Sequence, residues 1–326
     1  MLKASASKMV KISVGMMGSS VAAGSPSLAT PAQVSAFLDV VRSHGVRELD
    51  TARVYNDGKS EELLGEVQAH KDFLIATKAP AFTPGSLEYD NIILNCEKSL
   101  RALRVNTIDL YYLHGPDPRT GFEEQCRAIN SLHEQKKIDR WGISNLTPTQ
   151  VQEVYSICEK NKYPLPTAYQ GGYNPINRHQ SESNLLPLLK RLNMTFYAYS
   201  PLAGGLLAKP TEEIVTPKKG TRFDSMRVFG NMYLNEENIA VLRMLQNACT
   251  AAGISLLEAT MRWFMHHSPL GENDVVILGA SSDSQIAESL RACKKGPLPE
   301  TLFVAFEEMK NKSKVGDPFR SSKDTS

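Results

Sequence analysis

The chain has 326 residues, of which 41% are hydrophobic and 22% are charged, and its formal net charge is +2. These values exclude disorder of the whole chain, and the balanced charge leaves no electrostatic footprint for nucleic acid or a membrane surface. Five widely spaced cysteines without a CxxC motif indicate a reducing compartment, and we expect the cytoplasm. No apolar run reaches the roughly 18 residues of a membrane span. The first eleven residues lack the apolar core of a secretion signal, although a short mitochondrial presequence stays open.

Short apolar runs alternate with longer amphipathic segments along the chain. The short runs are bounded by turn residues and rich in β-branched and aromatic side chains, which predicts strands. Eight such runs occur, at residues 11–15, 46–50, 73–78, 107–114, 138–144, 166–170, 194–200 and 274–279.

The longer segments carry apolar residues at helical spacing. Thr30-Pro31 and Thr147-Pro148 are N-cap and first-turn pairs that open two of the helices, and Gly45 ends the first. Residues 201–234 show no clear period, and a loop this long in a compact protein is usually functional. The other helices are expected at about residues 60–69, 92–103, 122–135, 185–192, 236–252, 255–265, 282–293 and 299–310.

Strand and helix alternate with a repeat near ~30 residues, which means parallel strands with crossover helices. The closed barrel and the doubly wound sheet both have this pattern, and a nucleotide-binding doubly wound sheet normally carries GxGxxG after its first strand. The chain has no GxGxxG. We therefore predict α/β architecture with a single (β/α)8 TIM barrel, a long loop after strand 7 and an extra C-terminal helix. One domain is expected over residues 1–326, with its core at about 11–295 and a helix and polar tail at 296–326.

Several polar and aromatic residues lie at or just past the ends of six of the expected strands. A barrel gathers such residues in one pocket at the carboxyl ends of its strands. They are Asp50, Tyr55, Lys78, His114, Asn145, Gln170 and Tyr199.

Four of these residues fit the delivery of a proton to a carbonyl oxygen. A tyrosine has an ordinary pKa of about 10, and a Lys78 cation nearby would lower the pKa of Tyr55. Asp50 would hold Lys78 as a charged pair, and His114 would donate or orient a hydrogen bond to the carbonyl. Taken singly, each residue also fits an ordinary role in packing, capping or solvation, so the prediction rests on their joint placement.

Other short sequence matches do not complete any known site motif. Gly58-Lys59-Ser60 resembles the end of a phosphate-binding loop, but Arg53 stands where its first glycine is needed. His179 and Glu182 have HxxE spacing without the rest of a metal motif, and a structural role is favoured for His266-His267. No GxSxG occurs, and no residue pattern indicates a metal.

Several segments resemble the signature of the aldo-keto reductase superfamily, and others resemble its aflatoxin-aldehyde reductase branch. The resemblance covers about residues 11–295. The superfamily segments, besides Lys78, are "ELDTARVYNDGKSEELLG" (48–65), "IDLYYLHGPD" (108–117), "WGISN" (141–145) and "AYSPLAGGLL" (198–207). The branch segments are "YQGGYNPINR" (169–178), "MRWFMHH" (261–267) and "VILGASS" (276–282).

The resemblance implies an NADPH-dependent carbonyl reductase. It makes Tyr55 the general acid and gives Lys78 the role of lowering the pKa of Tyr55, with Asp50 completing the charge network. It makes His114 the residue that orients the substrate carbonyl. The predicted function is reduction of an aldehyde or ketone to an alcohol by hydride transfer.

The resemblance also implies a cofactor site. Polar side chains would hold the nicotinamide carboxamide, an aromatic ring would stack beneath the nicotinamide, and a loop of small residues would let backbone N–H groups approach phosphate. The carboxamide residues are Ser144, Asn145 and Gln170, with Tyr199 beneath the ring. The remaining contacts are Ser200, Leu202, Gly204 and Leu206 at the pyrophosphate, Arg222 at the 2′-phosphate or pyrophosphate, Ser281, Ser282, Gln285 and Glu288 at the adenosine, and Asp50, Lys209 and Gly279.

The chain departs from the family pattern near the substrate. Where related aldehyde reductases carry a tyrosine and an arginine that grip a carboxylate, this chain has Phe229 and Met232. A short acid-aldehyde such as succinic semialdehyde would lose its anchor, which favours a more apolar substrate near Met17 and Phe82. Ser289 stands where an asparagine is common, and positive charges are few. NADPH therefore comes from the family resemblance, and NADH stays open.

The sequence leaves alternative functions open. A cofactor-sensing regulatory subunit of an ion channel would have the same fold and slow turnover. An isomerase or aldolase using Lys78 as a Schiff base would need no nicotinamide. The expected partner is a small-molecule carbonyl substrate, and dimerisation is common in the branch, so a homodimer is expected too.

Overall fold

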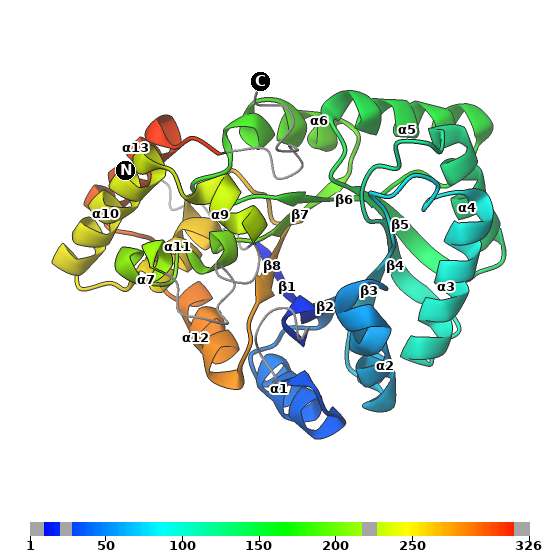
Figure 1. The fold of residues 1–326 in the computed structure, drawn as a ribbon, viewed down its shortest axis with the longest axis horizontal. Coiled ribbons are helices and arrows are strands. Elements are labelled where there is room, and N and C mark those ends of the chain that lie inside the picture. The colour runs from blue at the N-terminus through cyan, green and yellow to red at the C-terminus, as the bar shows by residue number, and fades with distance from the viewer. Residues whose placement is uncertain (1–9, 20–27, 217–226, 316–326) are drawn as a thin grey trace, which may run out of the picture.

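The computed structural model describes residues 10–19, 28–216 and 227–315. Within them, eight parallel strands form a closed barrel in the order β1 to β8, and β8 pairs back to β1 (Figure 1). This confirms the predicted (β/α)8 barrel. The strands are β1 (Lys11–Gly15), β2 (Glu48–Asp50), β3 (Leu74–Ala79), β4 (Ile108–Leu113), β5 (Ile138–Ser144), β6 (Ala168–Gly172), β7 (Thr195–Tyr199) and β8 (Val275–Gly279).

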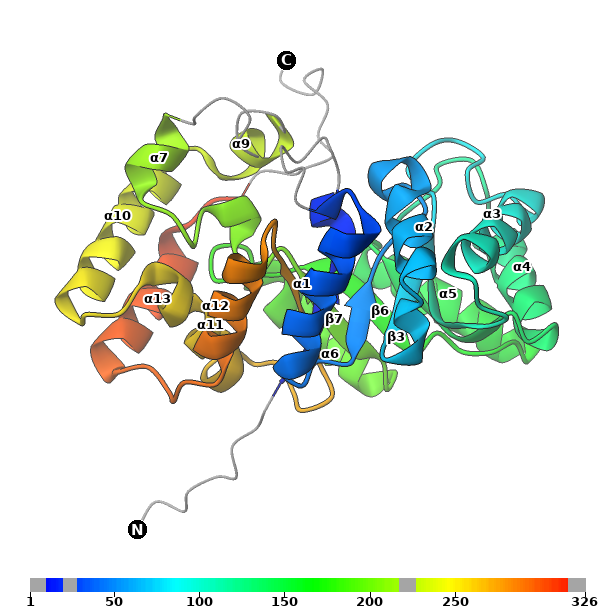
Figure 2. The same ribbon diagram turned by 90° about the horizontal axis from the view of Figure 1, so that it is seen from below.

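Helices surround the barrel on its outside (Figures 1 and 2). The predicted caps are present: the hydroxyls of Thr30 and Thr147 each accept a hydrogen bond from a backbone N–H of the first turn, and both are parts of capping boxes. The helices of the ring are α1 (Pro31–Ser43), α2 (Lys59–Glu66), α3 (Tyr89–Leu103), α4 (Phe122–Glu134), α5 (Pro148–Asn161), α6 (Leu186–Arg191) and α12 (Asp283–Cys293).

The connection from β7 to β8 contains several helices of its own. Among them, α10 (Glu236–Ala251) and α11 (Leu256–His266) match predicted helices. α7 (Thr211–Val215) and α9 (Arg227–Tyr233) lie in the stretch that showed no period, because helices this short present too few turns to reveal one. The predicted C-terminal helix, α13 (Glu300–Lys312), packs against α10, and these helices form a lobe at one side of the barrel (Figure 1).

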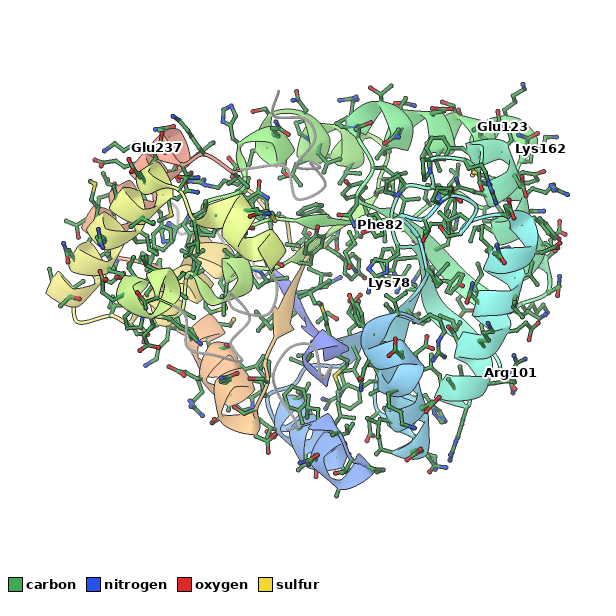
Figure 3. All side chains as sticks on the ribbon, in the orientation of Figure 1. Lys78, Phe82, Arg101, Glu123, Lys162 and Glu237 are labelled. Atoms are coloured by element: carbon green, nitrogen blue, oxygen red, sulfur yellow. The ribbon has the colours of Figure 1, made fainter. Side chains whose placement is uncertain are left out.

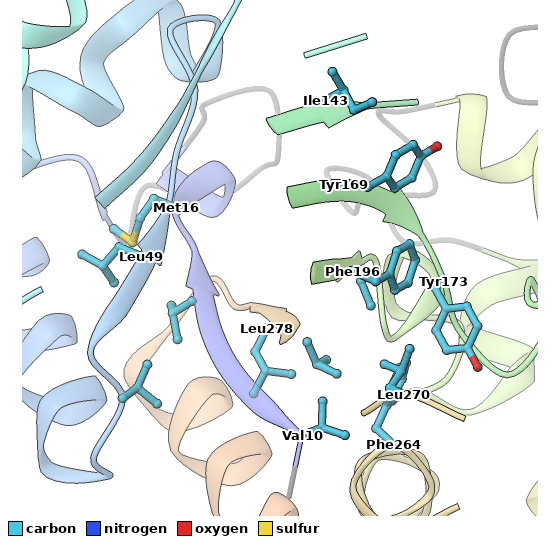
Figure 4. Close-up of a cluster of buried hydrophobic side chains, with 14 of the residues drawn as sticks. Val10, Met16, Leu49, Ile143, Tyr169, Tyr173, Phe196, Phe264, Leu270 and Leu278 are labelled. Atoms are coloured by element: carbon cyan, nitrogen blue, oxygen red, sulfur yellow. The ribbon is translucent and has the colours of Figure 1, made fainter. Parts of the chain in front are cut away.

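Two layers of buried side chains hold the barrel together. The inner cluster consists of strand residues, among them Leu110, Tyr112 and Tyr197. The outer cluster fills the space between strands and helices, and Figure 4 shows part of it. Burial on both faces explains why the strands read as continuous apolar runs in the sequence.

Strand register determines which side chains are neighbours at the carboxyl ends. Lys78 on β3 pairs with Tyr112 on β4, and Ser144 on β5 pairs with Gln170 on β6. Asp50 is the last residue of β2. Because the strands are parallel, these side chains lie at the same end of the ring.

Most predicted boundaries differ from the structure by a few residues at most, and two of the differences concern β6 and α6. β6 begins at Ala168 instead of residue 166, since Pro166 has no backbone N–H to contribute to the ladder. The helix expected at residues 185–192 is preceded by a π-helical turn, Ser181–Leu185, before α6 begins. Neither difference moves a candidate site residue away from its strand end.

In the described part of the chain, no single helix is long and apolar enough to cross a bilayer. Among the described helices, only α10 and α11 taken together have the length and apolar composition of a span, and they are bent by 93° relative to each other.

Candidate active site

The Lys78 ammonium lies at the centre of the candidate site. Its Nζ donates to Asp50 Oδ1 at 2.6 Å and to the carbonyl oxygen of Thr51 at 2.7 Å. The Lys78 side chain is fully buried, and Figure 3 labels it beside β3. The structure therefore contains the expected pair of Lys78 and Asp50.

Tyr55 and His114 lie next to this pair. Lys78 Nζ is 5.2 Å from the centroid of the Tyr55 ring. The rings of Tyr55 and His114 meet edge to face, with centroids 5.8 Å apart and an interplanar angle of 75°. The ends of β2, β3 and β4 thus bring together the four residues expected to handle a proton.

The electrostatics of Tyr55 differ from the sequence-based expectation. Burial first, and then the nearby Asp50 and Tyr199, raise the pKa of the Tyr55 hydroxyl well above its ordinary value. Lys78 was expected to lower this pKa. The Asp50 carboxylate, 2.6 Å from the ammonium, offsets the field of Lys78 at the phenol. Tyr55 therefore keeps its proton through the neutral pH range.

Lys78 and His114 both have lowered pKa values. Burial lowers the pKa of Lys78, and its pairing with Asp50 opposes that shift. Burial, followed by the Lys78 charge, lowers the pKa of His114 to about 3. The His114 imidazole is therefore neutral near pH 7 and has one N–H donor and one acceptor nitrogen.

Gln170 links the charged pair to the other residues of the candidate site. Its Nε2 donates to Asp50 Oδ2 at 2.8 Å. Because an ionised carboxylate only accepts hydrogen bonds, the amide nitrogen must face Asp50 and the amide oxygen must face away. Gln170 is only 3% exposed, so packing holds this orientation. Its oxygen is then an acceptor suited to a ligand amide.

Asn145 is the centre of a second hydrogen-bonded cluster. Its Nδ2 donates to the His114 carbonyl oxygen at 3.0 Å and to Ser144 Oγ at 2.9 Å, and its Oδ1 accepts from the Tyr199 hydroxyl at 2.8 Å. Its backbone is left-handed, with φ of 58°, a conformation in which asparagine is enriched. The Asn145 N–H also donates to the Gln170 carbonyl at 3.3 Å. The structure thus brings together the four residues expected around a nicotinamide.

The segment after β7 turns sharply. The Ala203 N–H donates to the Ser200 carbonyl and the Gly205 N–H to the Leu202 carbonyl, both at 2.9 Å. Turns with left-handed residues present backbone N–H groups on a concave side, which suits an anion. Leu206 is buried, so its side chain belongs to the core and its backbone alone is available to a ligand. Positive φ values of 54°, 49°, 72° and 110° occur at Ser200, Ala203, Gly204 and Gly205.

The residues expected around an adenosine lie at the start of α12. Ser282 Oγ accepts from the Gln285 N–H at 3.3 Å, and Gln285 Oε1 accepts from the Ser281 N–H at 3.0 Å. These contacts cap the helix, which also explains the residue types in the absence of a ligand. Gly279 and Glu288 are exposed close by.

The expected basic contacts are only partly described. Lys209 is exposed just before α7, and its carbonyl accepts from Gln246 Nε2 at 2.8 Å. Arg222 lies outside the described residues. Ser289, which replaces a common asparagine, is buried in α12. Among the described residues, the candidate contacts for an adenosine are therefore mainly neutral polar groups, with few positive charges.

Phe82 forms an apolar edge beside His114. Their rings are 5.9 Å apart at an interplanar angle of 61°, and Phe82 is 40% exposed. A Cβ at Gly115 would overlap the Phe82 ring, so this glycine makes room for the aromatic contact. Met17 and Met232 are half-buried. Phe229 lies in α9, and its side chain is outside the described part of the structure.

Sequence reasoning missed two contacts of Lys78. One is the Thr51 carbonyl, a backbone group that no residue type reveals. The other is Tyr112, whose ring centroid lies 5.7 Å from Lys78 Nζ. Thr51 directly follows β2, and Tyr112 lies in β4 opposite Lys78, so pairing neighbouring strands by their last residues would have found Tyr112.

Motifs set aside in the sequence have structural partners. His266 Nε2 lies 2.7 Å from the Lys295 carbonyl, and His267 Nε2 accepts from the Leu298 N–H at 2.9 Å. Glu182 accepts from the Tyr173 hydroxyl at 2.8 Å and pairs with Lys310 of α13 at 2.5 Å. These contacts attach the C-terminal segment to the barrel.

The fold and the site define a (β/α)8 barrel with its chemistry at the carboxyl ends of the strands. Over residues 11–311 the sequence matches the model of the aldo/keto reductase family. The chain belongs to this family, whose members use nicotinamide cofactors. Membership supports an oxidoreductase that acts on carbonyl groups.

Curated relatives match most of the chain. The oxidoreductase sirO of Leptosphaeria maculans is 39% identical over 83% of this chain and 83% of its own. The human aldo-keto reductase family 7 member A3 is 39% identical over 84% of this chain and 86% of its own. The human aflatoxin B1 aldehyde reductase member 2 is 38% identical over 86% of this chain and 81% of its own.

Proposed function

We propose that this protein reduces an aldehyde or ketone to an alcohol with NADPH, and that Tyr55 donates the proton. The observation that supports this best is the placement of the Tyr55 ring beside both the buried Lys78–Asp50 pair and the His114 imidazole. NADPH would supply the hydride that adds to the carbonyl carbon. The chain would supply the proton that the carbonyl oxygen then needs.

The shifted pKa values agree with the proposal that NADPH supplies the hydride and Tyr55 the proton. The raised pKa of Tyr55 keeps a proton on its hydroxyl at neutral pH. As negative charge leaves the carbonyl oxygen and reaches the phenol, the buried Lys78 ammonium stabilises that charge over a short distance. The neutral His114 holds the carbonyl oxygen with its N–H. The positive charge of Lys78 disfavours a second cation at this position.

The residues present fit a nicotinamide. The Gln170 amide oxygen, the Ser144 hydroxyl and the Asn145 amide offer both donors and acceptors for a carboxamide. Tyr199, half-buried at the end of β7, offers a flat surface for the ring. Asn145 and Tyr199 hydrogen-bond to each other in this structure, so the site is ordered in advance, which raises affinity by reducing the cost of ordering. The left-handed turns from Ser200 to Gly205 suit a pyrophosphate.

The substrate we propose is apolar and without a carboxylate. Phe82 borders the His114 side of the pocket, and Met17, Met232 and Phe229 are the other candidate contacts. Phe229 and Met232 replace the residues that would bind an acid group. The human relative at 38% identity is named as an aflatoxin B1 aldehyde reductase, and an aldehyde substrate agrees with this proposal.

The contacts of Lys78 do not favour a Schiff-base mechanism. Its Nζ lies between the Asp50 carboxylate, the Thr51 carbonyl and the rings of Tyr55 and Tyr112. A carbonyl carbon would have to displace one of these groups to reach it. A regulatory subunit with slow turnover would retain the same site, and measured turnover separates it from the reductase.

We also propose the cytoplasm as the location of the protein and a homodimer as its assembly. The five cysteines are all free and buried, which agrees with a reducing compartment.

The first test follows NADPH absorbance with an aromatic aldehyde, a dicarbonyl, a quinone and succinic semialdehyde. Oxidation with the apolar compounds and little with succinic semialdehyde is expected. The variant Tyr55→Phe should lose most of the turnover, on the order of 10²–10⁴-fold for a lost general acid, and should bind NADPH as before. Undiminished turnover in Tyr55→Phe would show that another group donates the proton.

A further inference from the structure

Three consecutive residues after Tyr55 have left-handed backbone. The φ angle is 52° at Asn56, 52° at Asp57 and 89° at Gly58. Asparagine and aspartate adopt this conformation at lower cost than other residues with a side chain, and contacts outside the turn add to its stability. The turn leads directly from the tyrosine into α2. Its conformation therefore contributes to the position of Tyr55.

Arg53 and Glu61 form a buried ion pair across this turn. Arg53 Nη1 lies 2.5 Å from Glu61 Oε2, and the two side chains are 14% and 0% exposed. A Cβ at Gly58 would overlap the Arg53 guanidinium, so the guanidinium lies directly against this glycine. Arg53, which precedes the turn, thus packs against Gly58 and pairs with Glu61, which follows the turn.

Both residues of the pair are also bound to β3. The Arg53 N–H donates to the Lys78 carbonyl at 3.2 Å. Thr77 Oγ1 donates to Glu61 Oε1 at 2.6 Å. Thr77 and Lys78 are adjacent, so a closed path runs from the Lys78 backbone through Arg53 and Glu61 back to β3. The turn that carries Tyr55 and the strand that carries Lys78 form one unit.

We propose that Arg53 and Glu61 are positioning residues that fix the Tyr55 hydroxyl relative to the Lys78 ammonium. The pair acts through Tyr55 and the turn after it, and the inference rests on the proposed function of Tyr55 as the acid. A guanidinium suits this task because it is planar and binds a carboxylate while its face lies against the backbone. In the phosphate-loop motif a glycine would stand at position 53, and here the arginine has this different use.

The test uses a double variant, Arg53→Met/Glu61→Gln. Removing Arg53 alone would leave a buried carboxylate unpaired and can prevent folding. The double variant removes both charges, and the glutamine still accepts from Thr77. The matched control is Arg262→Met/Glu258→Gln, which removes an ion pair of 3.0 Å on α11 whose arginine is also 14% exposed.

The expected result is a loss in kcat of about tenfold or more, within the range of coupling between contacting residues. The Kd for NADPH should change by no more than about twofold. In a Tyr55→Phe background, the double variant should leave the residual rate unchanged, because the pair acts only through the tyrosine. The control pair should lower Tm and leave kcat unchanged.

Amide hydrogen exchange measures how firmly the turn is held, and it needs no substrate. The Lys59 N–H is bonded to the carbonyls of Tyr55 and Asn56, and it should exchange faster in the double variant than in wild type or the control. Unchanged exchange, unchanged kcat or an equal further loss in the Tyr55→Phe background would each overturn the proposal. If Tyr55→Phe itself keeps full activity, the acid assignment is wrong, and hydrogen exchange still decides whether Arg53 and Glu61 hold the turn.

Discussion

Gln170 and Asp50 are 120 positions apart in the sequence and are joined by a hydrogen bond of 2.8 Å from Nε2 to Oδ2. The other carboxylate oxygen of Asp50 accepts from Lys78 at 2.6 Å. The amide expected at the nicotinamide and the lysine beside the proposed acid therefore share one carboxylate. A change at Gln170 affects both sides of the site.

Replacing Gln170 with Leu should weaken NADPH binding and turnover together. The variant leaves Asp50 Oδ2 without its donor, at a cost of about 1–3 kcal/mol, or roughly 5–150-fold. NADPH affinity is measured by fluorescence titration, and kcat by absorbance. The control is Gln125→Leu, since Gln125 is also buried but donates to the Thr120 carbonyl at 2.8 Å. Equal effects of the two variants on NADPH affinity would contradict the shared role of Asp50.

His114 should make the protein less stable in acid. The pKa of His114 is about 3 in the folded chain, below its ordinary 6.5. Between these values the unfolded chain binds a proton that the folded chain does not, so the free energy of unfolding falls as pH decreases from about 6.5. Above pH 6.5 the contribution of His114 to the free energy of unfolding is constant. Urea unfolding at several pH values should show a weaker dependence for His114→Gln, and parallel curves for the two proteins would refute the prediction.

Asp117 should stabilise the loop after β3. Burial would raise the pKa of Asp117, but N–H groups of Leu87, Arg119 and Gly85 and the Thr120 hydroxyl lower it to about 2. Because this folded pKa is depressed, its stabilising effect is present at neutral pH and is lost as pH falls toward about 2. Asp117→Asn should cost about 1–3 kcal/mol at pH 7, measured by urea unfolding. The exposed Asp139→Asn is the control, and equal losses would rule out this role.

Gly115→Ala should change substrate use more than stability. Its methyl group would overlap the Phe82 ring and push the ring away from His114. A drop of about tenfold in kcat/KM for aromatic aldehydes is expected, as for other losses of one apolar contact in a pocket. Gly296→Ala is the control, because no atom lies within 4 Å of its added Cβ. Unaltered kcat/KM in Gly115→Ala would show that Phe82 does not contact the substrate.

The barrel could be predicted because each strand is a short apolar run followed by a turn and a periodic helix. The same rhythm located Asp50, Lys78 and His114, since a strand end is visible in sequence. Other features depend on three-dimensional proximity. The raised pKa of Tyr55 reflects burial and the charge of Asp50, and the Arg53–Glu61 pair depends on a left-handed turn that brings the two side chains together.

The two halves of the proposed reaction come from different arcs of the barrel. β2, β3 and β4 end near Asp50, Lys78 and His114, whereas β6 and β7 contribute Gln170 and Tyr199. The proposed substrate and the proposed cofactor would therefore contact different loops. The Asp50 carboxylate is bonded to both arcs, so a substitution in one arc that moves this carboxylate also disturbs the other.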